Sequence, residues 1–330
     1  MKKSTSLILP VTYSLISSKA LQEELIPLYS LPKESKVLFL YQGIHDTYLV
    51  QGSLSKFILR IYRAGWKTFE QVKAELQLLL FLKEQGLSVS YPIAATNAIF
   101  IHQINSPEGE RYSVMFSYAQ GEKLTSLSVT QAFQFGKLIA HMHLITQSKK
   151  IKDLHRDYSI NSILKNSLQI TQTVLHAYPE ALKKLAIING IVKKKLTPLV
   201  IKELKTGICH GDPHFENIFI EPVANRVTIY DFDFSGNGYL LYDVGSFCFY
   251  ERNSETNIKS FLEGYTQLMP LTNLELALVP YFKVLMRLFH LGARSKNADG
   301  IKNPLWFPNE IIEKINDIEK EVYSLRAKPR

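Results

Sequence analysis

Cysteine and long apolar runs are scarce in this 330-residue sequence. Its two cysteines, Cys209 and Cys248, lack the spacing of a metal site, which argues against a disulfide framework and a structural zinc site and favours a reducing, cytoplasmic setting. The longest apolar run, residues 76–82, contains Gln77 and is far shorter than the ~20 residues that a membrane helix needs. We therefore expect no membrane segment.

We also expect that the first residues are not a secretory leader. Two lysines occur near the start, but Pro10, Thr12 and Ser14 interrupt the apolar stretch, and no small-residue cleavage pattern follows. The formal net charge of +9 suits anionic partners. However, the lysines cluster between Lys183 and Lys205 without interleaved aromatics, so we expect a solvated helical face and no nucleic-acid partner.

The first third of the chain has the texture of a small sheet with one helix. Three β-branched or aromatic runs in residues 37–63, separated by glycines, predict an antiparallel meander. Apolar residues then recur at spacings of three and four from Phe69 to Leu82, which predicts a helix that ends before Gly86. Two further strands are expected at residues 98–103 and 112–118.

Beyond Gly121 the patterns become mainly helical. We expect helices at residues 129–145, 160–176, 179–195, 258–268 and 274–294, the first of them capped by Ser128. A hairpin interrupts them, with strands "NIFIE" and "VTIYDF" around the turn "PVAN". Because strands and helices are segregated, we predict an α+β fold with two lobes, a small antiparallel-sheet lobe at residues 1–118 and a larger, mainly helical lobe at residues 119–330.

The stretch "HGDPHFEN" carries the strongest chemical signal. His210, Asp212 and Asn217 fit the spacing H-x-D-x-x-x-x-N, and Asp231 follows the next predicted strand. This pattern is typical of phosphoryl transfer from ATP, in which the aspartate accepts the proton of the acceptor hydroxyl while the asparagine and a second acid bind magnesium. Hard oxygen ligands suit Mg²⁺.

A competing tripeptide, "HRD", occurs at His155 to Asp157. Its asparagine, Asn161, follows the aspartate by four residues instead of five, and no strand with a metal-binding acid comes after it. We interpret this tripeptide as a loop or a helix cap.

The stretch "HGDPHFENIFI…VTIYDFDFSGNGYLLYDVGSF" resembles the catalytic core of the aminoglycoside phosphotransferase-like kinases, a protein-kinase-like family with homoserine kinase of the second type, choline kinase and a bacterial stress-response kinase among its members. The runs "FILRIYRAGWKTFEQVKAELQLL" and "FGKLIAHMHL" extend the resemblance over about 280 residues. It implies the bilobal fold of that family and a kinase that uses ATP and Mg²⁺.

Residue by residue, the resemblance implies Asp212 as catalytic base, Asn217 and Asp231 as magnesium ligands, His210 as a support of the loop and Asp243 as its brace. Two further residues keep alternatives open. His214 has either a substrate contact or a packing role, and Asp233 is either another ligand or a solvent-facing or capping residue. His143 is expected to be a satisfied core histidine.

The prediction of nucleotide-binding side chains depends on strand alternation in "KFILRIYR", which places Ile58 and Arg60 on one face of the strand. Ile58 would cover the adenine and Arg60 would point at the phosphates, with Glu75 of the next helix as its ion-pair partner. Many relatives have lysine where Arg60 stands, and a guanidinium differs from an ammonium in plane and length.

Two main-chain segments complete the expected nucleotide site. The loop "YQGIHDTYLV" contains Gly43 but no G-x-G-x-x-G. Its backbone amides would therefore cover the phosphates with less conformational freedom than a glycine-rich loop has. The adenine is expected to hydrogen-bond the main chain of a connecting segment formed by Phe116, Ser117, Tyr118 and Ala119.

Three functions are compatible with these patterns. The first is a kinase that phosphorylates a hydroxyl of a small metabolite, such as an amino alcohol, homoserine or a sugar, because only eleven residues separate Asp231 from Asp243, too few to hold a peptide. The second is a serine/threonine protein kinase of the stress-response type, which shares the "NP…W" segment around Trp306. The third is an ATP-binding pseudokinase, motivated by Arg60. Aminoglycosides are less favoured as acceptors because a polycation needs an acidic site and the chain is basic.

Overall fold

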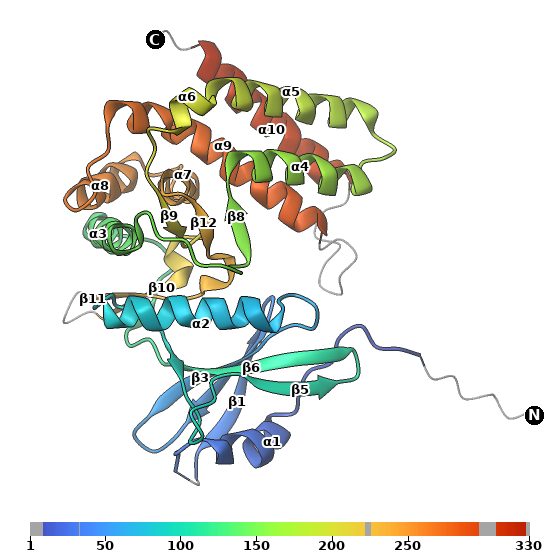
Figure 1. The fold of residues 1–330 in the computed structure, drawn as a ribbon, viewed down its shortest axis with the longest axis vertical. Coiled ribbons are helices and arrows are strands. Elements are labelled where there is room, and N and C mark those ends of the chain that lie inside the picture. The colour runs from blue at the N-terminus through green and yellow to red at the C-terminus, as the bar shows by residue number, and fades with distance from the viewer. Residues whose placement is uncertain (1–8, 33, 222–225, 297–307, 328–330) are drawn as a thin grey trace, which may run out of the picture. The chain divides into compact units, whose positions relative to one another are not determined.

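The computed structural model describes residues 9–32, 34–221, 226–296 and 308–327 (Figure 1). The chain divides into two compact units, one formed by Met1–Leu80 and Ser90–Tyr118, the other by Phe81–Val89 and Ala119–Arg330. The segment Phe81–Val89 thus packs with the second unit although it precedes Tyr118 in sequence.

The first unit is built on a six-stranded antiparallel sheet. In sheet order its main path is β1 (Lys36–Gln42), β2 (Asp46–Gln51), β3 (Lys56–Ile61), β6 (Gly109–Ser117) and β4 (Pro92–Ile93), and β5 (His102–Ser106) also pairs with β6. The predicted meander is confirmed. The strand expected at residues 98–103 begins only at His102, because Ala98 adopts φ 63° in a turn that its amide closes on the carbonyl of Ala95. The short strand β4 was not expected.

The two faces of β3 have different neighbours, as the alternation predicted. Leu59 and Ile61 are fully buried in a core shared with Tyr48 of β2. A short helical segment before the sheet contributes to the same core and comprises α1 (Ser18–Ala20), a π-helical turn (Leu21–Leu25) and a 3₁₀ turn (Ile26–Leu28). On the other face, Arg60 meets Glu75 of α2 (Phe69–Glu84), the predicted helix that ends before Gly86.

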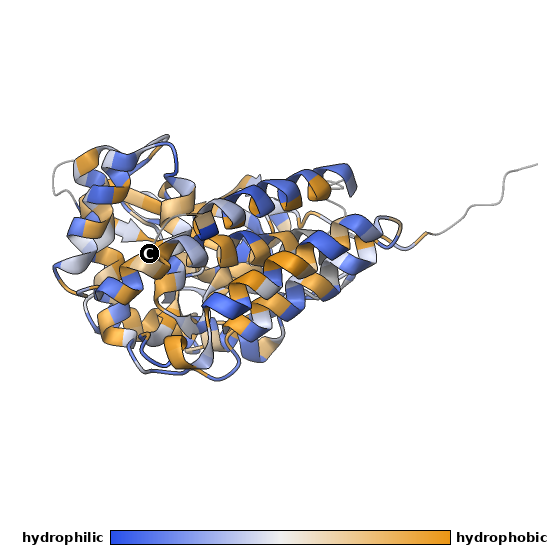
Figure 2. Cartoon of the chain, turned by 90° about the horizontal axis from the view of Figure 1, so that it is seen from above, coloured by the Kyte–Doolittle hydropathy of each residue, from blue (hydrophilic) through white to orange (hydrophobic). Residues whose placement is uncertain are grey.

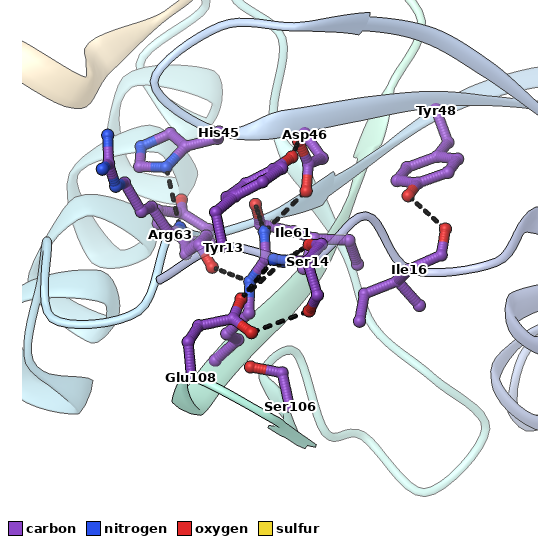
Figure 3. A network of polar contacts seen from close by, with 12 residues as sticks. Tyr13, Ser14, Ile16, His45, Asp46, Tyr48, Ile61, Arg63, Ser106 and Glu108 are labelled. Atoms are coloured by element: carbon purple, nitrogen blue, oxygen red, sulfur yellow. Dashed lines mark hydrogen bonds and ion pairs between the residues drawn. The ribbon is translucent and has the colours of Figure 1, made fainter. Parts of the chain in front are cut away.

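A buried polar network ties the N-terminal segment to this sheet (Figure 3). The Arg111 guanidinium donates to the Asp46 carboxylate at 2.7 Å and to the Ser14 carbonyl at 2.8 Å. Tyr13 donates to the same Asp46 carboxylate, and Glu108 accepts from the Ser14 hydroxyl at 2.7 Å. Because a buried charge is costly without partners, these contacts hold residues 13 and 14 against β2 and β6.

The second unit is mainly helical, which together with the sheet of the first unit confirms the α+β class. Its helices are α3 (Val129–Thr146), α4 (Ile160–Val174), α5 (Pro179–Lys195), α6 (Pro198–Ile201), α7 (Leu241–Tyr250), α8 (Glu255–Thr266), α9 (Asn273–Lys296) and α10 (Pro308–Ala327). Ser128 caps α3 in a capping box with Gln131, as the sequence predicted. Several of these helices carry hydrophilic and hydrophobic residues on different sides (Figure 2).

Two small sheets lie within the helical unit. One has the order β11 (Arg226–Ile229), β10 (Ile218–Glu221) and β7 (Glu122–Lys123), and contains the predicted hairpin, whose turn "PVAN" is outside the described residues. The other has the order β8 (Arg156–Tyr158), β12 (Gly236–Tyr239) and β9 (Thr206–Cys209). No helix in the described ranges is both long and apolar enough to cross a membrane.

Candidate active site

The loop from β9 to β10 carries Asp212, and Asp243 holds this loop in place. The Asp243 carboxylate, in the first turn of α7, accepts the backbone N–H of His210 at 2.7 Å and that of Gly211 at 2.9 Å. His143 of α3 contacts the same carboxylate at 3.0 Å and the Tyr265 hydroxyl at 2.8 Å. Asp243 therefore braces the loop, and His143 is a buried core histidine with both ring nitrogens in hydrogen bonds.

Gly211 is required at the sharp bend of this loop. Its φ of +87° lies in the left-handed region that favours glycine, and a Cβ atom there would lie 2.2 Å from the Tyr158 hydroxyl and 2.3 Å from the Phe234 carbonyl oxygen. The bend turns Asp212 out of the buried end of β9 and leaves its side chain 16% exposed.

The Asp212 carboxylate is surrounded by hydrogen-bond donors. Its Oδ1 accepts the Tyr250 hydroxyl, and its Oδ2 accepts from Asn217 Nδ2 at 3.3 Å and contacts His214 Nε2 at 3.3 Å. Burial raises the pKa of Asp212, but the hydrogen bond and charge of His214, the charge of His290 and the Tyr250 hydrogen bond outweigh burial and hold this pKa well below its ordinary value. Asp212 is therefore ionised near neutral pH.

The two histidines beside Asp212 have opposite pKa shifts. Burial lowers the pKa of His210, whose Nε2 lies 3.0 Å from the Tyr230 carbonyl, so this ring is a neutral support of the loop. Burial also lowers the pKa of His214, but its hydrogen bond with Asp212 and the nearby carboxylates outweigh burial and raise this pKa. His214 therefore contacts the Asp212 carboxylate directly and is not only a packing residue.

The hairpin brings Asp231 to the same region as Asn217. The backbone N–H of Tyr230 donates to the Asn217 carbonyl at 3.0 Å, just beyond the Ile218–Ile229 pair of the β10–β11 ladder. Asp212 and Asp231 both raise the pKa of His214, so the two carboxylates lie within electrostatic range of one ring. Asp231 has φ 62°, which is uncommon for a residue other than glycine and often marks a functional position.

A cavity of about 730 Å³ in the second unit is lined by neighbours of Asp212. Tyr250 and His290 line it, and these are two of the side chains that act on the Asp212 carboxylate. Neither residue was identified from the sequence. Tyr250 and His290 follow Asp212 by 38 and 78 positions, and no spacing rule connects them to it.

In the first unit Glu75 pairs with two cations. Its carboxylate lies 3.5 Å from Arg60, the expected partner, and 2.6 Å from Lys67, whose side chain is 1% exposed. Lys67 was missed because a lysine between β3 and α2 carries no sign in the sequence that it is buried. Arg60 also lies over the Phe116 ring at 5.3 Å, so it shares a face of the sheet with the expected adenine segment.

The structure narrows the main-chain groups expected to meet the nucleotide. The Ser117 N–H donates to the Tyr91 carbonyl at 2.8 Å, and the Ser117 carbonyl accepts the Ser90 hydroxyl at 2.7 Å. Because both main-chain groups of Ser117 already have partners, adenine contacts are expected from Tyr118 and Ala119. Ile58 pairs with Phe116 across β3 and β6. The N–H of Gly43 donates to the His45 carbonyl at 2.9 Å inside the β1–β2 turn.

The competing "HRD" tripeptide has a structural role. Arg156 and Asp157 lie in the short strand β8 instead of a loop, and Asp157 accepts the N–H of Ser159, the N-cap of α4, at 2.8 Å. Burial lowers the pKa of Arg156, while Tyr158 and Asp233 act in the opposite direction. Asp233 is 2% exposed and its charge acts on Arg156, so of the alternatives for this residue the solvent-facing one is excluded.

Fold and site together define a phosphotransferase of the kinase type, with an ionised aspartate on a braced loop next to an acid-bearing hairpin. The family model of the phosphotransferase enzyme family matches residues 39–273. The chain belongs to this family, as its sequence motifs indicated, and it is a kinase.

The chain is also similar to two other proteins and to a solved structure. An uncharacterized protein of Synechocystis sp. is 31% identical over 270 residues, 81% of this chain and 74% of the relative. A homoserine kinase of Agrobacterium fabrum is 23% identical over 256 residues, 73% of this chain and 74% of that enzyme. The structure of an amicoumacin kinase with AMP-PNP and Ca²⁺ has a TM-score of 0.73 at 19% identity and covers 93% of this chain and 94% of its own. That likeness shows the protein-kinase-like fold.

Proposed function

We propose that the protein transfers the γ-phosphate of ATP, with Mg²⁺, to a hydroxyl group of a small metabolite, and that Asp212 is the catalytic base. One observation carries the proposal: an ionised Asp212 is held on a braced loop beside Asn217 and the hairpin that bears Asp231. Asp212 would accept the hydroxyl proton as the acceptor oxygen bonds to the γ-phosphorus, while the bond from that phosphorus to the β,γ-bridging oxygen breaks and ADP leaves. A carboxylate of low pKa is a weak base, which fits a loose transition state in which the proton leaves late.

Asn217 and Asp231 are the proposed ligands of Mg²⁺, and their chemistry fits this ion. Nδ2 of Asn217 donates to the main-chain and side-chain oxygens of Asp212, so its Oδ1 is the atom that would ligate a metal. Carboxylate and amide oxygens are hard ligands, and Mg²⁺ usually takes few protein ligands together with phosphate oxygens. When bound, the ion neutralises charge on the polyphosphate. Within the described ranges no three or more His, Cys, Asp or Glu side chains form a group that could hold a metal.

ATP is the proposed donor. A kinase of the same fold has been solved with AMP-PNP, a nucleotide of the ATP type. Arg60 is the proposed phosphate contact, because its side chain is 13% exposed whereas Lys67 is 1% exposed and closer to Glu75. Gly43, Ile58 and the main chain after Ser117 remain the other proposed nucleotide contacts.

The cavity next to Asp212 favours a small acceptor over a protein. Its volume of about 730 Å³ falls in the range of roughly 300–1,000 Å³ typical of small-molecule sites. The short segment between Asp231 and Asp243 is occupied by a 3₁₀ turn (Phe232–Phe234) and by β12, which is paired on both sides. Trp306 and the rest of the "NP…W" segment, which motivated the protein-kinase alternative, lie outside the described residues.

The test is transfer of radiolabel from γ-labelled ATP, with Mg²⁺, to a pool of hydroxyl metabolites and to a peptide library. We expect labelled metabolite, and a loss of about 10²- to 10⁴-fold in kcat for Asp212→Asn with nucleotide binding retained. Asp157→Asn, in the "HRD" tripeptide, is the matched control and should keep full activity. Labelled peptide alone would favour the protein-kinase alternative, and ATP binding without transfer would favour a pseudokinase. An Asp212→Asn enzyme as active as Asp157→Asn would refute the role of Asp212.

A further inference from the structure

The cavity beside Asp212 is rich in basic side chains. Five of them line it, against two acidic ones, Asp317 and Glu321. The basic residues come from the turn after α7, from α9 and from α10: Arg252, Lys283, Arg287, Lys314 and Lys320.

Ion pairs neutralise only part of this charge. Glu321 is shared by Lys283, at 2.7 Å, and Arg287, at 2.6 Å, so this trio keeps a net positive charge. Lys320 and Asp317 approach to 3.9 Å, but both are largely exposed, and such a pair contributes little. The cavity therefore has a positive potential that attracts anions and repels cations.

Two guanidinium groups are held in place on one wall of the cavity. Arg252 and Arg287 lie over the ring of Phe249, at 4.7 and 5.5 Å from its centroid, and Arg252 also donates to the Phe249 carbonyl at 3.1 Å. Stacking on an aromatic ring limits the motion of a guanidinium, and each of these two groups has in-plane N–H donors besides the one used on Glu321 or on the Phe249 carbonyl. A planar fork of N–H donors matches the oxygens of a carboxylate or a phosphate.

The cavity and the proposed base share a neighbour. Tyr250 lines the cavity and donates its hydroxyl hydrogen to the Asp212 carboxylate. The proposal below places the acceptor hydroxyl at Asp212 and the rest of the acceptor beside Tyr250, in the basic region.

We propose that this cavity binds the acceptor through an anionic group held by Arg252 and Arg287, so that the acceptor is a small hydroxyl compound bearing a carboxylate or a phosphate. The inference rests on the proposed function and narrows it, because neutral sugars and purely cationic amino alcohols would leave the basic side chains without a counter-charge. Cationic antibiotics would be repelled.

Four probes with the same three-carbon scaffold test the charge of the acceptor: glycerol, glycerate, glycerol 3-phosphate and 3-amino-1,2-propanediol. Release of ADP with Mg·ATP is measured for each, and binding without nucleotide is followed by thermal shift and calorimetry. We expect turnover or stabilisation with one or both anionic probes and not with the neutral or cationic ones. The two anionic probes separate a carboxylate acceptor from a phosphate acceptor. The effect should weaken as salt is raised.

The matched variants change the same charge inside and outside the cavity. Arg252→Gln, Lys314→Gln and Lys320→Gln are combined in one protein; all three residues are exposed, so folding should persist. We expect KM or Kd for the anionic probe to rise roughly tenfold with KM for ATP unchanged. The control combines Lys165→Gln, Lys183→Gln and Lys193→Gln, exposed lysines of α4 and α5 that do not line this cavity, and should bind as the wild type does.

Three results would overturn the inference: preference for glycerol or for the amine, no anion-selective turnover or stabilisation at all, or equal effects of the two triple variants. The proposed function fails by a different result. If Asp212→Asn leaves turnover intact, the proposed catalytic role is wrong whatever the acceptor. If Asp212→Asn is inactive but the wild type prefers a neutral or cationic acceptor, only the inference about the anionic acceptor is wrong.

Discussion

Replacement of Glu75 by glutamine should destabilise the first unit strongly. The Glu75 carboxylate is 2% exposed and lies 2.6 Å from the Lys67 ammonium, which is 1% exposed, and 3.5 Å from Arg60. Glutamine has nearly the same shape but no charge, so the buried Lys67 ammonium would lose the carboxylate that lies 2.6 Å from it. Breaking a buried pair in this way costs about 3–5 kcal/mol.

Tryptophan fluorescence can follow this loss in the first unit. The chain has two tryptophans, and Trp306→Phe leaves Trp66, the neighbour of Lys67, as the single reporter. With a urea m-value of about 2 kcal/mol/M, a loss of about 4 kcal/mol lowers the unfolding midpoint by about 2 M. The experiment is done without nucleotide, because a ligand that binds the folded state would mask part of the change.

Glu70→Gln is the matched control on the same helix. Glu70 is exposed, so its replacement should change stability by no more than about 0.5 kcal/mol. If the Glu75 and Glu70 variants unfold at the same urea concentration, the Lys67–Glu75 pair does not stabilise the unit and the reasoning is wrong. Because Arg60 would lose a partner as well, the Glu75 variant should also bind Mg·ATP more weakly.

Two further predictions concern the bend at Gly211 and the N-terminal network. Gly211→Ala should lower the free energy of unfolding by several kcal/mol (roughly 3 or more) and abolish activity, because the new Cβ would collide with the Phe234 carbonyl at a φ of +87°. Gly190→Ala is the control, because nothing lies within 4 Å of the added Cβ, and it should leave the melting temperature unchanged or slightly higher. Burial raises the pKa of Glu108, but hydrogen bonds, chiefly from Ser14, outweigh it and lower this pKa below 4.5. A carboxylate whose pKa is lower in the folded state stabilises the fold above its unfolded-state pKa, and this stabilisation is lost as pH falls. The free energy of unfolding of the wild type should therefore exceed that of Glu108→Gln by about 1–2 kcal/mol at neutral pH. The difference between their denaturant midpoints should close as pH falls below 4.5. A gap independent of pH would show that the Glu108 charge contributes nothing.

Some elements of the helical unit could not be predicted from periodicity. Helix α7 is buried at eight successive positions from Leu241 to Cys248, so these residues present no face to solvent. Its sequence therefore shows no regular alternation of polar and apolar residues. Helix α10 did have a usable signal, because Ile311, Ile315, Ile318 and Val322 recur at spacings of three and four and are all buried. The strands β8 and β12 have too few residues for alternation to be recognised.

The sequence by itself determined the family, the α+β class and the segment that carries Asp212, Asn217 and Asp231. These three residues lie within twenty positions of one another, so a loop and one hairpin are enough to connect them. Such local geometry follows from spacing, turn residues and strand alternation.

Only the tertiary structure decided which distant side chains act on this segment. Tyr250 and His290 reach Asp212 from α7 and α9, and Lys67 competes with Arg60 for Glu75. The basic side chains of the cavity likewise come together from separate helices. Contacts of this kind depend on how helices pack around a shared core. Packing is set by many weak interactions between residues far apart in sequence, and for this reason it leaves no local pattern to read.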